Sequence, residues 1–216
     1  MIDYFYLSKN NIVNEEIFKK GLVTIQDQTS GLASHILNPK LDSKVLDMCC
    51  APGGKLTHLS QIMKNSGTID AYELQENKIK LIIENLSRLD VKNVSLKCQN
   101  ALDIEEKEYD YILLDAPCSG YGVIRQKPEI KLKKHSDQEN LELIDLQEKL
   151  LDKAYKCMKK GTEIVYSTCT INKDENENQI NKFLNKYKDV EIIYEKIFFG
   201  EEYDNDGFYI CKMKKK

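Results

Sequence analysis

The sequence has no tryptophan and only three histidines, and none of its apolar runs is long enough to cross a membrane. A membrane-spanning helix needs about 20 mostly apolar residues. The first ten residues, MIDYFYLSKN, also lack the basic and then apolar pattern of a secretory signal peptide. These absences argue against a membrane protein, and we expect a cytoplasmic one.

Paired cysteine motifs are missing as well. The seven cysteines include no C-x-x-C pair, and no histidine stands at zinc-finger spacing from them. We therefore expect no disulfide framework and no metal site. Each cysteine is in the first instance a small, reduced, buried apolar residue, so reactive thiols have to be found by their position.

Positive charge is not in excess. The formal net charge is −3, which argues mildly against a protein wrapped in nucleic acid. One short segment is nevertheless basic and contains Arg125, Lys127, Lys131, Lys133 and Lys134. Two interpretations stay open for this segment, a solvated face or a set of contacts to phosphates.

Strand-like and helix-like patterns alternate along most of the 216 residues, which are enough for one good-sized domain. Short apolar runs predict strands at 44–49, 68–74, 94–98, 109–117 and 163–168, and two closing strands at 190–196 and 207–214. Helical spacing predicts helices at 56–63, 79–89 and 137–158, and Asn172 with Glu175 resembles a capping box that opens another. This order predicts an α/β fold with a parallel sheet, helices on both faces and an antiparallel pair at the edge.

Ligands of such sheets bind at the carboxyl ends of the strands. The first strand ends in DMCCAPGGK, where Gly53 and Gly54 allow a sharp turn and a close approach of the backbone to a ligand. The pattern differs from dinucleotide and P-loop motifs, so no diphosphate cradle is indicated. Glu73 ends the second strand and could accept the ribose hydroxyls of a nucleoside, or it is a solvated strand-end residue. S-adenosylmethionine, with a ribose, an adenine and a cationic sulfonium, fits this combination.

Further polar residues follow the next strands. Asn100 and Asp103 follow the third strand, Asp115 ends the fourth, and Cys118 and Cys169 follow the fourth and fifth. We expect all of them to face one crevice, with both thiols close to a methyl donor. Position alone does not distinguish the roles of the two cysteines.

Five separated motifs, in order, are similar to those of the RNA (cytosine-5) methyltransferases. They are VTIQDQTSG, DMCCAPGGK (with Cys50 where alanine is usual), LLDAPCSGYGVIRQKPEIK, YSTCT and DGFYICKMKK, and they span about residues 21–216. The resemblance is strongest to the bacterial 16S ribosomal RNA branch, the Sun/Fmu type. It implies a Rossmann-like class I S-adenosylmethionine-dependent methyltransferase fold, with a mostly parallel seven-stranded sheet and an antiparallel edge strand. We expect an N-terminal extension carrying the first motif at 1–38 and a catalytic domain at 39–216.

The resemblance also implies which residues bind the cofactor: Cys49, Cys50, Ala51, Pro52, Gly53, Gly54, Lys55, Glu73, Asn100 and Asp115. The family usually has an acidic residue where Asn100 stands, so an uncharged amide contacts the adenine or Asp103 substitutes. The ribosomal branch usually carries an N-terminal helical RNA-binding domain that this sequence does not contain. The sequence is then either a minimal form or a fragment.

The catalytic roles come from the resemblance too. C5 of cytosine is a poor nucleophile, so a thiolate first adds at C6, C5 accepts the methyl group, and a base removes the C5 proton before the thiol leaves. Cys169 is implied as the nucleophile, Cys118 in product release, Asp115 in holding the base, and Lys55 in lowering the pKa of the thiol. The target base must leave its stack, so we expect single-stranded or loop RNA, bound by a monomer through the basic segment.

Three rival functions remain. A methyltransferase for a small molecule or a protein would leave both strand-end cysteines unexplained. An RNA-binding or assembly module without activity would keep cofactor binding but transfer no methyl group. A nicotinamide dehydrogenase is disfavoured by the missing glycine pattern. A covalent adduct with RNA that contains 5-fluorocytosine would distinguish an RNA (cytosine-5) methyltransferase from these three rivals.

Overall fold

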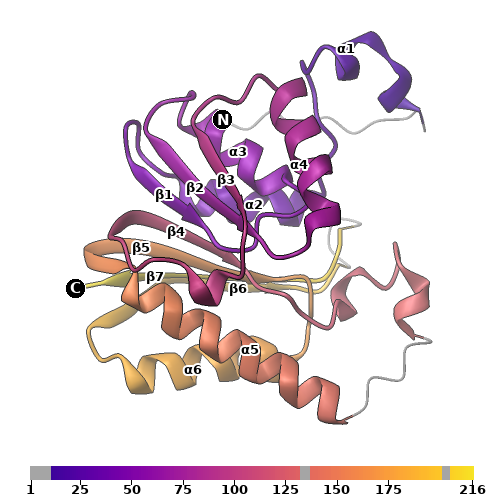
Figure 1. Ribbon diagram of the computed structural model, residues 1–216. Coiled ribbons are helices and arrows are strands. Elements are labelled where there is room, and N and C mark those ends of the chain that lie inside the picture. The colour runs from indigo at the N-terminus through magenta and orange to yellow at the C-terminus, as the bar shows by residue number, and fades with distance from the viewer. Residues whose placement is uncertain (1–10, 132–136, 201–204) are drawn as a thin grey trace.

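The computed structural model describes residues 11–131, 137–200 and 205–216. A seven-stranded sheet lies between two layers of helices (Figure 1). The strands are β1 Lys44–Asp47, β2 Thr68–Glu73, β3 Val94–Cys98, β4 Tyr109–Asp115, β5 Met158–Thr168, β6 Val190–Phe198 and β7 Phe208–Lys215. Their order in the sheet is β3-β2-β1-β4-β5-β7-β6.

Most of the helices form the two outer layers. The helices are α1 Glu16–Lys19, α2 Gln28–Leu37, α3 Gly54–Ile62, α4 Glu76–Arg88, α5 Asp137–Lys156 and α6 Glu177–Lys186. Short 3-10 turns are η1 Ile12–Asn14, η2 Ala101–Asp103, η3 Tyr121–Val123, η4 Pro128–Lys131 and η5 Lys173–Glu175. Helices α2, α3 and α4 cover one face of the sheet, and α5 and α6 cover the other (Figure 1).

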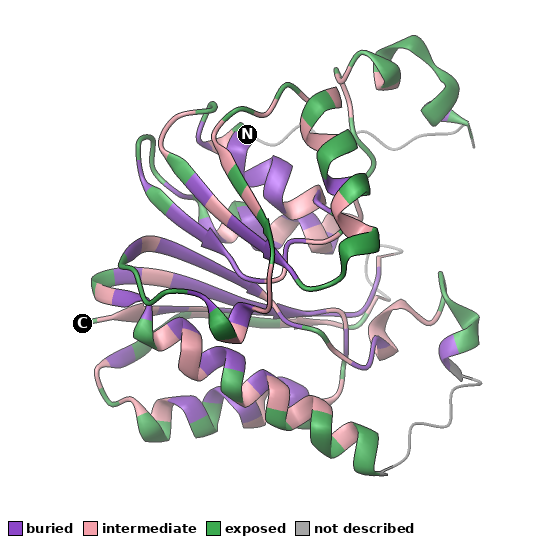
Figure 2. Cartoon of the chain, viewed as in Figure 1, coloured by how far each residue is buried: buried purple, intermediate pink, exposed green. Residues whose placement is uncertain are grey.

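Two apolar cores lie between the sheet and these layers, as the buried residues in Figure 2 show. Successive side chains of a strand point to opposite faces, so a strand covered on both sides must be apolar throughout. In β4, Ile112 and Leu114 pack towards α5 and α6, whereas Leu113 packs towards α2, α3 and α4. The solid apolar centre of this strand therefore places its carboxyl end, Asp115, between two helical layers.

The predicted fold class is confirmed. Strands β1 to β5 are parallel, and β7 runs antiparallel to both of its neighbours, β5 and β6. The antiparallel pairing predicted at the edge is therefore present, with β6 as the outermost strand.

One element boundary was predicted wrongly. The helix predicted to end at Met158 ends at Lys156, and Met158 begins β5, because its apolar side chain suits a buried strand as well as a helical stripe. The helix predicted at 79–89 is present as α4, and its apolar residues are unevenly buried, since Ile82 is fully buried but Ile83 is 54% exposed.

The division predicted at residue 38 stays a prediction. Helix α2, which precedes it, packs against the sheet through Ala33 and Leu37, both fully buried. Asp27 caps the start of this helix by accepting a hydrogen bond from the Ser30 N–H. Among the described residues, none of the helices combines the length and the apolarity needed to cross a bilayer.

Candidate active site

Two cysteines meet at the carboxyl ends of β4 and β5. The register of these parallel strands pairs Asp115 with Ser167, so the loops that follow begin side by side. The Sγ atoms of Cys118 and Cys169 lie 3.2 Å apart. A disulfide would require about 2.05 Å, so the pair consists of two free thiols within hydrogen-bonding distance.

An ion pair lies beside the thiols. Lys55, in the first turn of α3, places its Nζ 2.7 Å from Asp115 Oδ2, and both side chains are largely buried. The other carboxylate oxygen of Asp115 accepts a hydrogen bond from Ser167 Oγ at 2.8 Å. The Lys55 Nζ also lies 5.1 Å from the centre of the Phe208 ring. Asp115 is thereby fixed from two sides and keeps lone pairs for a further donor.

The glycine-rich loop joins β1 to α3. Gly53 has φ +101° and caps the helix, a backbone conformation that side chains other than glycine rarely adopt. Cys50 donates its N–H to the Tyr72 carbonyl, and its side chain lies in the core, so only its backbone faces the loop. Cys49, Ala51 and Gly54 are half-buried and Pro52 is exposed.

The predicted contacts to a nucleoside lie at the ends of β2 and β3. The Glu73 carboxylate is largely buried, and its Oε1 accepts a hydrogen bond from the Gln75 N–H at 2.8 Å. Asn100 Oδ1 accepts from the Leu102 N–H and so caps the turn η2, while Asp103 is exposed. The amide nitrogen of Asn100 is then the atom with which this residue could meet an adenine.

A buried carboxylate joins the two cysteine loops. Glu175 accepts hydrogen bonds from four donors, namely Ser119 N–H, Ser119 Oγ, Gln147 Nε2 and Asn172 Nδ2, at 2.6–3.0 Å. Ser119 Oγ also lies 2.8 Å from Thr170 Oγ1. Ser119 follows Cys118 and Thr170 follows Cys169, so this network positions both thiols. The predicted capping box is wrong in this respect, because the carboxylate of Glu175 contacts the neighbouring loop instead of the N–H of Asn172.

The residues predicted to bind RNA are only partly described. Arg125 and Lys127 are exposed. Burial and the charge of Asp27 raise the pKa of the nearby Asp206 carboxyl to about 6, and the positive charges of Arg125 and Lys127 oppose this rise. Lys133 and Lys134 lie outside the described residues, as does the side chain of Lys131.

Residues 34–214 match the sequence profile of a family described as 16S rRNA methyltransferase RsmB/F. The chain belongs to this family. The predicted membership is confirmed, and the family consists of S-adenosylmethionine-dependent methyltransferases.

Curated proteins of this family are similar over nearly the whole chain. The sequence is 37% identical to the probable ribosomal RNA small subunit methyltransferase B of Bacillus subtilis, over 99% of this chain and 52% of that protein. It is 35% identical to the corresponding enzyme of Proteus mirabilis, over 92% of this chain and 47% of that protein. The chain thus spans about half the length of these RsmB relatives.

Solved structures agree with this assignment. NSun6 from Pyrococcus horikoshii, crystallised with SFG, an analogue of S-adenosylmethionine, superposes with a TM-score of 0.87 at 29% identity, over 96% of this chain and 56% of that one. A methyltransferase homologue from the same organism gives 0.86 at 33% identity, over 96% and 72% of the two chains.

The two thiols have opposite acidities. The hydrogen bond from Cys118 lowers the pKa of Cys169, although burial and the charge of Asp115 oppose this effect, and the positive charge of Lys55 adds to it. The same hydrogen bond raises the pKa of Cys118 well above its usual value, and burial adds to the increase. In an RsmB/F site, a thiolate at Cys169 beside a protonated Cys118 is the arrangement that these contacts stabilise.

The charge of the cleft fits a cationic cofactor. Asp47, the last residue of β1, is fully buried, and in the described part of the chain neither carboxylate oxygen has a partner of good hydrogen-bond geometry. Burial raises the pKa of Asp47 to about 8, and the charges of Asp115 and Glu73 contribute. Asp47 thus lies near two further acidic residues and a single lysine, Lys55. This excess of acidic groups suits the sulfonium and ammonium groups of S-adenosylmethionine and disfavours a phosphate.

Two residues of the site, Asp47 and Glu175, were not predicted from the sequence. Asp47 ends a strand just as Glu73 and Asp115 do, so the rule that selected those residues would also have selected Asp47. Glu175 gave no such signal, since its partner Ser119 is 56 positions away and only the fold brings the two together.

Proposed function

We propose that this chain transfers a methyl group from S-adenosylmethionine to C5 of a cytosine in RNA, with ribosomal RNA of the small subunit as the substrate. The proposal depends most on one observation, the pair of thiols 3.2 Å apart with opposite shifts in pKa beside the Asp115–Lys55 ion pair. Family membership and the ribosomal RNA methyltransferases among the relatives support the same reaction.

Cys169 is the nucleophile in this proposal. Its lowered pKa favours the thiolate, which adds to C6 of the cytosine and makes C5 electron-rich. Bound S-adenosylmethionine supplies the methyl group that C5 then accepts. Asp115, held by Lys55 and Ser167, accepts a hydrogen bond from the N4 amino group of the base.

Cys118 acts in product release. Its raised pKa keeps its proton while Cys169 is a thiolate, so it is poised to assist when the C6–sulfur bond breaks. A base removes the C5 proton in the same stage, and the electrons of that C–H bond restore the ring as the Cys169 thiolate leaves. The Glu175 network holds the two sulfur atoms together through both stages.

The cofactor is held by the backbone of residues 49–55 and by the side chains of Asp47, Glu73, Asn100 and Asp115. Arg125, Lys127 and the lysines of the basic segment contact phosphates of a single-stranded or looped RNA. The protein acts as a monomer in the cytoplasm, where ribosomal RNA is found, with a catalytic domain at 39–216 preceded by an extension. Light scattering and limited proteolysis test the oligomeric state and the boundary.

A trapping experiment tests the reaction. RNA containing 5-fluorocytosine cannot lose a proton from C5, so the wild-type protein should form a stable covalent adduct visible on a denaturing gel. Cys169→Ala should form none, whereas Cys118→Ala should accumulate an adduct with ordinary RNA. Cys118→Ser, which keeps a hydrogen-bond donor beside Cys169, is the matched control.

The reverse pattern would exchange the two roles, and no adduct with any variant would contradict the covalent route. Bisulfite sequencing of ribosomal RNA from a deletion strain identifies the nucleotide. If every 5-methylcytosine of the small-subunit RNA persisted in that strain, the proposed substrate would be wrong.

A further inference from the structure

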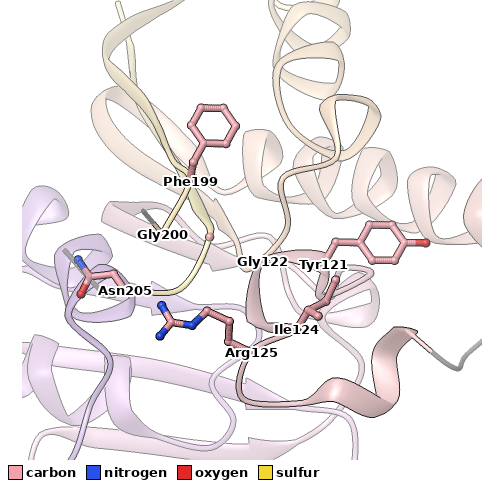
Figure 3. Close-up of a pocket in the computed structure, with 8 residues that line it drawn as sticks. Tyr121, Gly122, Ile124, Arg125, Phe199, Gly200 and Asn205 are labelled. Atoms are coloured by element: carbon pink, nitrogen blue, oxygen red, sulfur yellow. The ribbon is translucent and has the colours of Figure 1, made fainter. Parts of the chain in front are cut away.

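A hollow of about 500 Å³ lies beside the loop that follows Cys118 (Figure 3). Its walls come from the loop after β4 and from the segment between β6 and β7, and they include Tyr121, Ile124, Arg125, Phe199 and Asn205. Its size falls within the range of about 300–1,000 Å³ that is usual for ligand pockets.

Glycine backbone ties the hollow to the nucleophile. Gly122 donates its N–H to the Cys169 carbonyl at 3.0 Å, and Gly207 donates its N–H to the Gly122 carbonyl at 2.8 Å. A Cβ atom added to Gly122 would lie 1.9 Å from the Gly207 carbonyl oxygen, so the two backbones pack without room for a side chain. Both glycines line the hollow. One wall of the hollow is therefore backbone that is hydrogen-bonded directly to the backbone of Cys169.

The walls offer aromatic and planar polar groups. Phe199 is 65% exposed, and Figure 3 shows its ring and that of Tyr121 on two different sides of Gly122. The guanidinium of Arg125 extends towards Asn205 in the same view. Exposed aromatic rings, a guanidinium and an amide are the groups on which proteins stack and hydrogen-bond the unpaired bases of RNA.

The charge next to the hollow is balanced. Asp206 is largely buried and accepts a hydrogen bond from Gln126 Nε2 at 2.7 Å, and its carboxyl group lies near Arg125 and Lys127. A carboxylate close to the cations makes the hollow less suited to an acidic side chain than to a neutral, flat group.

We propose that this hollow is a subsite for the base of a nucleotide adjacent to the target cytosine in an unpaired RNA strand. Phe199 provides the stacking surface, and Arg125 and Asn205 contact the edge of the base or its phosphate. The description of the occupant as a neighbour of the target cytosine rests on the proposed function, because that function places the cytosine at Cys169.

Binding of a designed RNA tests the subsite without any methyl transfer. The probe is a fluorescein-labelled nonanucleotide of uridines with one central cytosine, and two further probes have an abasic residue immediately 5′ or 3′ of that cytosine. Dissociation constants are measured by anisotropy for the wild-type protein and for Phe199→Ala. Stacking of one base contributes about 1–3 kcal/mol, which corresponds to a change of roughly 5- to 150-fold in the dissociation constant.

We expect one of the two abasic probes to bind the wild type more weakly by such a factor. Phe199→Ala should bind the intact probe equally weakly, and the same abasic substitution should then have no further effect on this variant. Phe199→Trp should restore the sensitivity. Ile193→Ala, which removes a 49% exposed apolar side chain from β6, is the matched control and should behave as the wild type does.

Three results would overturn the subsite. The losses of affinity caused by Phe199→Ala and by the abasic substitution could add independently, or the abasic probes could bind as well as the intact one. The third is that the wild type binds no probe up to millimolar concentration. Coupling between Phe199 and one flanking base without methylation of any RNA would support the subsite and contradict the proposed function. Methylation of RNA without that coupling would support the proposed function and contradict the subsite.

Discussion

The buried carboxyl group of Asp47 offers a direct test of how the cleft is built. It is fully buried at the end of β1, lacks a good hydrogen-bond partner in the described part of the chain, and faces the charges of Asp115 and Glu73. These surroundings raise its pKa from 3.8 to about 8. We expect Asp47→Asn, which has the same shape and no charge, to stabilise the ligand-free protein near neutral pH.

The magnitude follows from linkage between protonation and folding. Each pKa unit corresponds to about 1.36 kcal/mol, and about three units separate the unfolded pKa from pH 7, so the ionisable carboxyl costs up to about 4 kcal/mol there. A raised pKa gives stability that is complete below the unfolded value of 3.8 and is lost as the pH rises to about 8. The free energy of unfolding of the wild type should therefore fall over this window relative to that of Asp47→Asn.

Guanidinium denaturation at pH 5, 6, 7 and 8 measures this difference. The amide of the variant is itself unsatisfied, at a cost of about 1–3 kcal/mol that does not depend on pH. The test is therefore how the difference in the free energy of unfolding between the two proteins changes with pH, and not the size of that difference at any one pH. Asp103→Asn, at an exposed carboxyl, is the control and should show no such slope. Sinefungin, a cationic analogue of the cofactor, should raise the melting temperature of the wild type more than that of Asp47→Asn.

A difference between the two proteins that stayed constant from pH 5 to pH 8 would refute the reasoning. It would mean that Asp47 is ionised in the folded protein across this range, held by a donor that the geometry does not show. Equal stabilisation of both proteins by sinefungin would separately contradict a role of this carboxylate towards the cofactor.

Two further predictions concern the thiols and the network that positions them. Lys55→Met should shift the pH dependence of Cys169 alkylation by iodoacetamide to higher pH, because the lysine charge lowers the pKa of that thiol; an unchanged profile would contradict this. Glu175→Gln should lower the free energy of unfolding by about 1–3 kcal/mol, because an NH₂ group would replace one acceptor oxygen in a buried network. Denaturation of this variant beside Glu148→Gln, at a half-exposed carboxylate, measures the loss, and equal losses would show that the network contributes nothing.

Much of the fold was predictable because the strands are short and covered on both faces. An unbroken apolar run such as Ile112–Leu114 allows no other placement in a mixed α/β pattern, and its neighbours in the sheet follow from the alternation with helices. The end of α5 was less certain, since Met158 satisfies both the helical stripe and the strand, and only the pairing of Met158 with Tyr109 decides between them.

The candidate site could be predicted as far as strand ends define it. Asp115, Cys118 and Cys169 follow neighbouring strands, and the register of β4 with β5 is enough to bring them together. Which thiol is the more acidic could not be predicted from spacing, because the acidity depends on which sulfur donates the hydrogen bond and which lies nearer to Lys55.

The hydrogen bonds of Glu175, which hold the thiols in place, could not be predicted for a different reason. Helix propensity and capping rules interpret Glu175 through residues three or four positions away. Its carboxylate instead accepts bonds from Ser119 and Gln147, on a loop and a helix 56 and 28 positions earlier in the chain. A buried carboxylate is costly unless several donors surround it, so once the fold buries Glu175 these four donors become obligatory. The geometry of the two cysteines therefore depends on a residue that the local pattern assigns to helix capping, and a change at Glu175 should disturb both thiols at once.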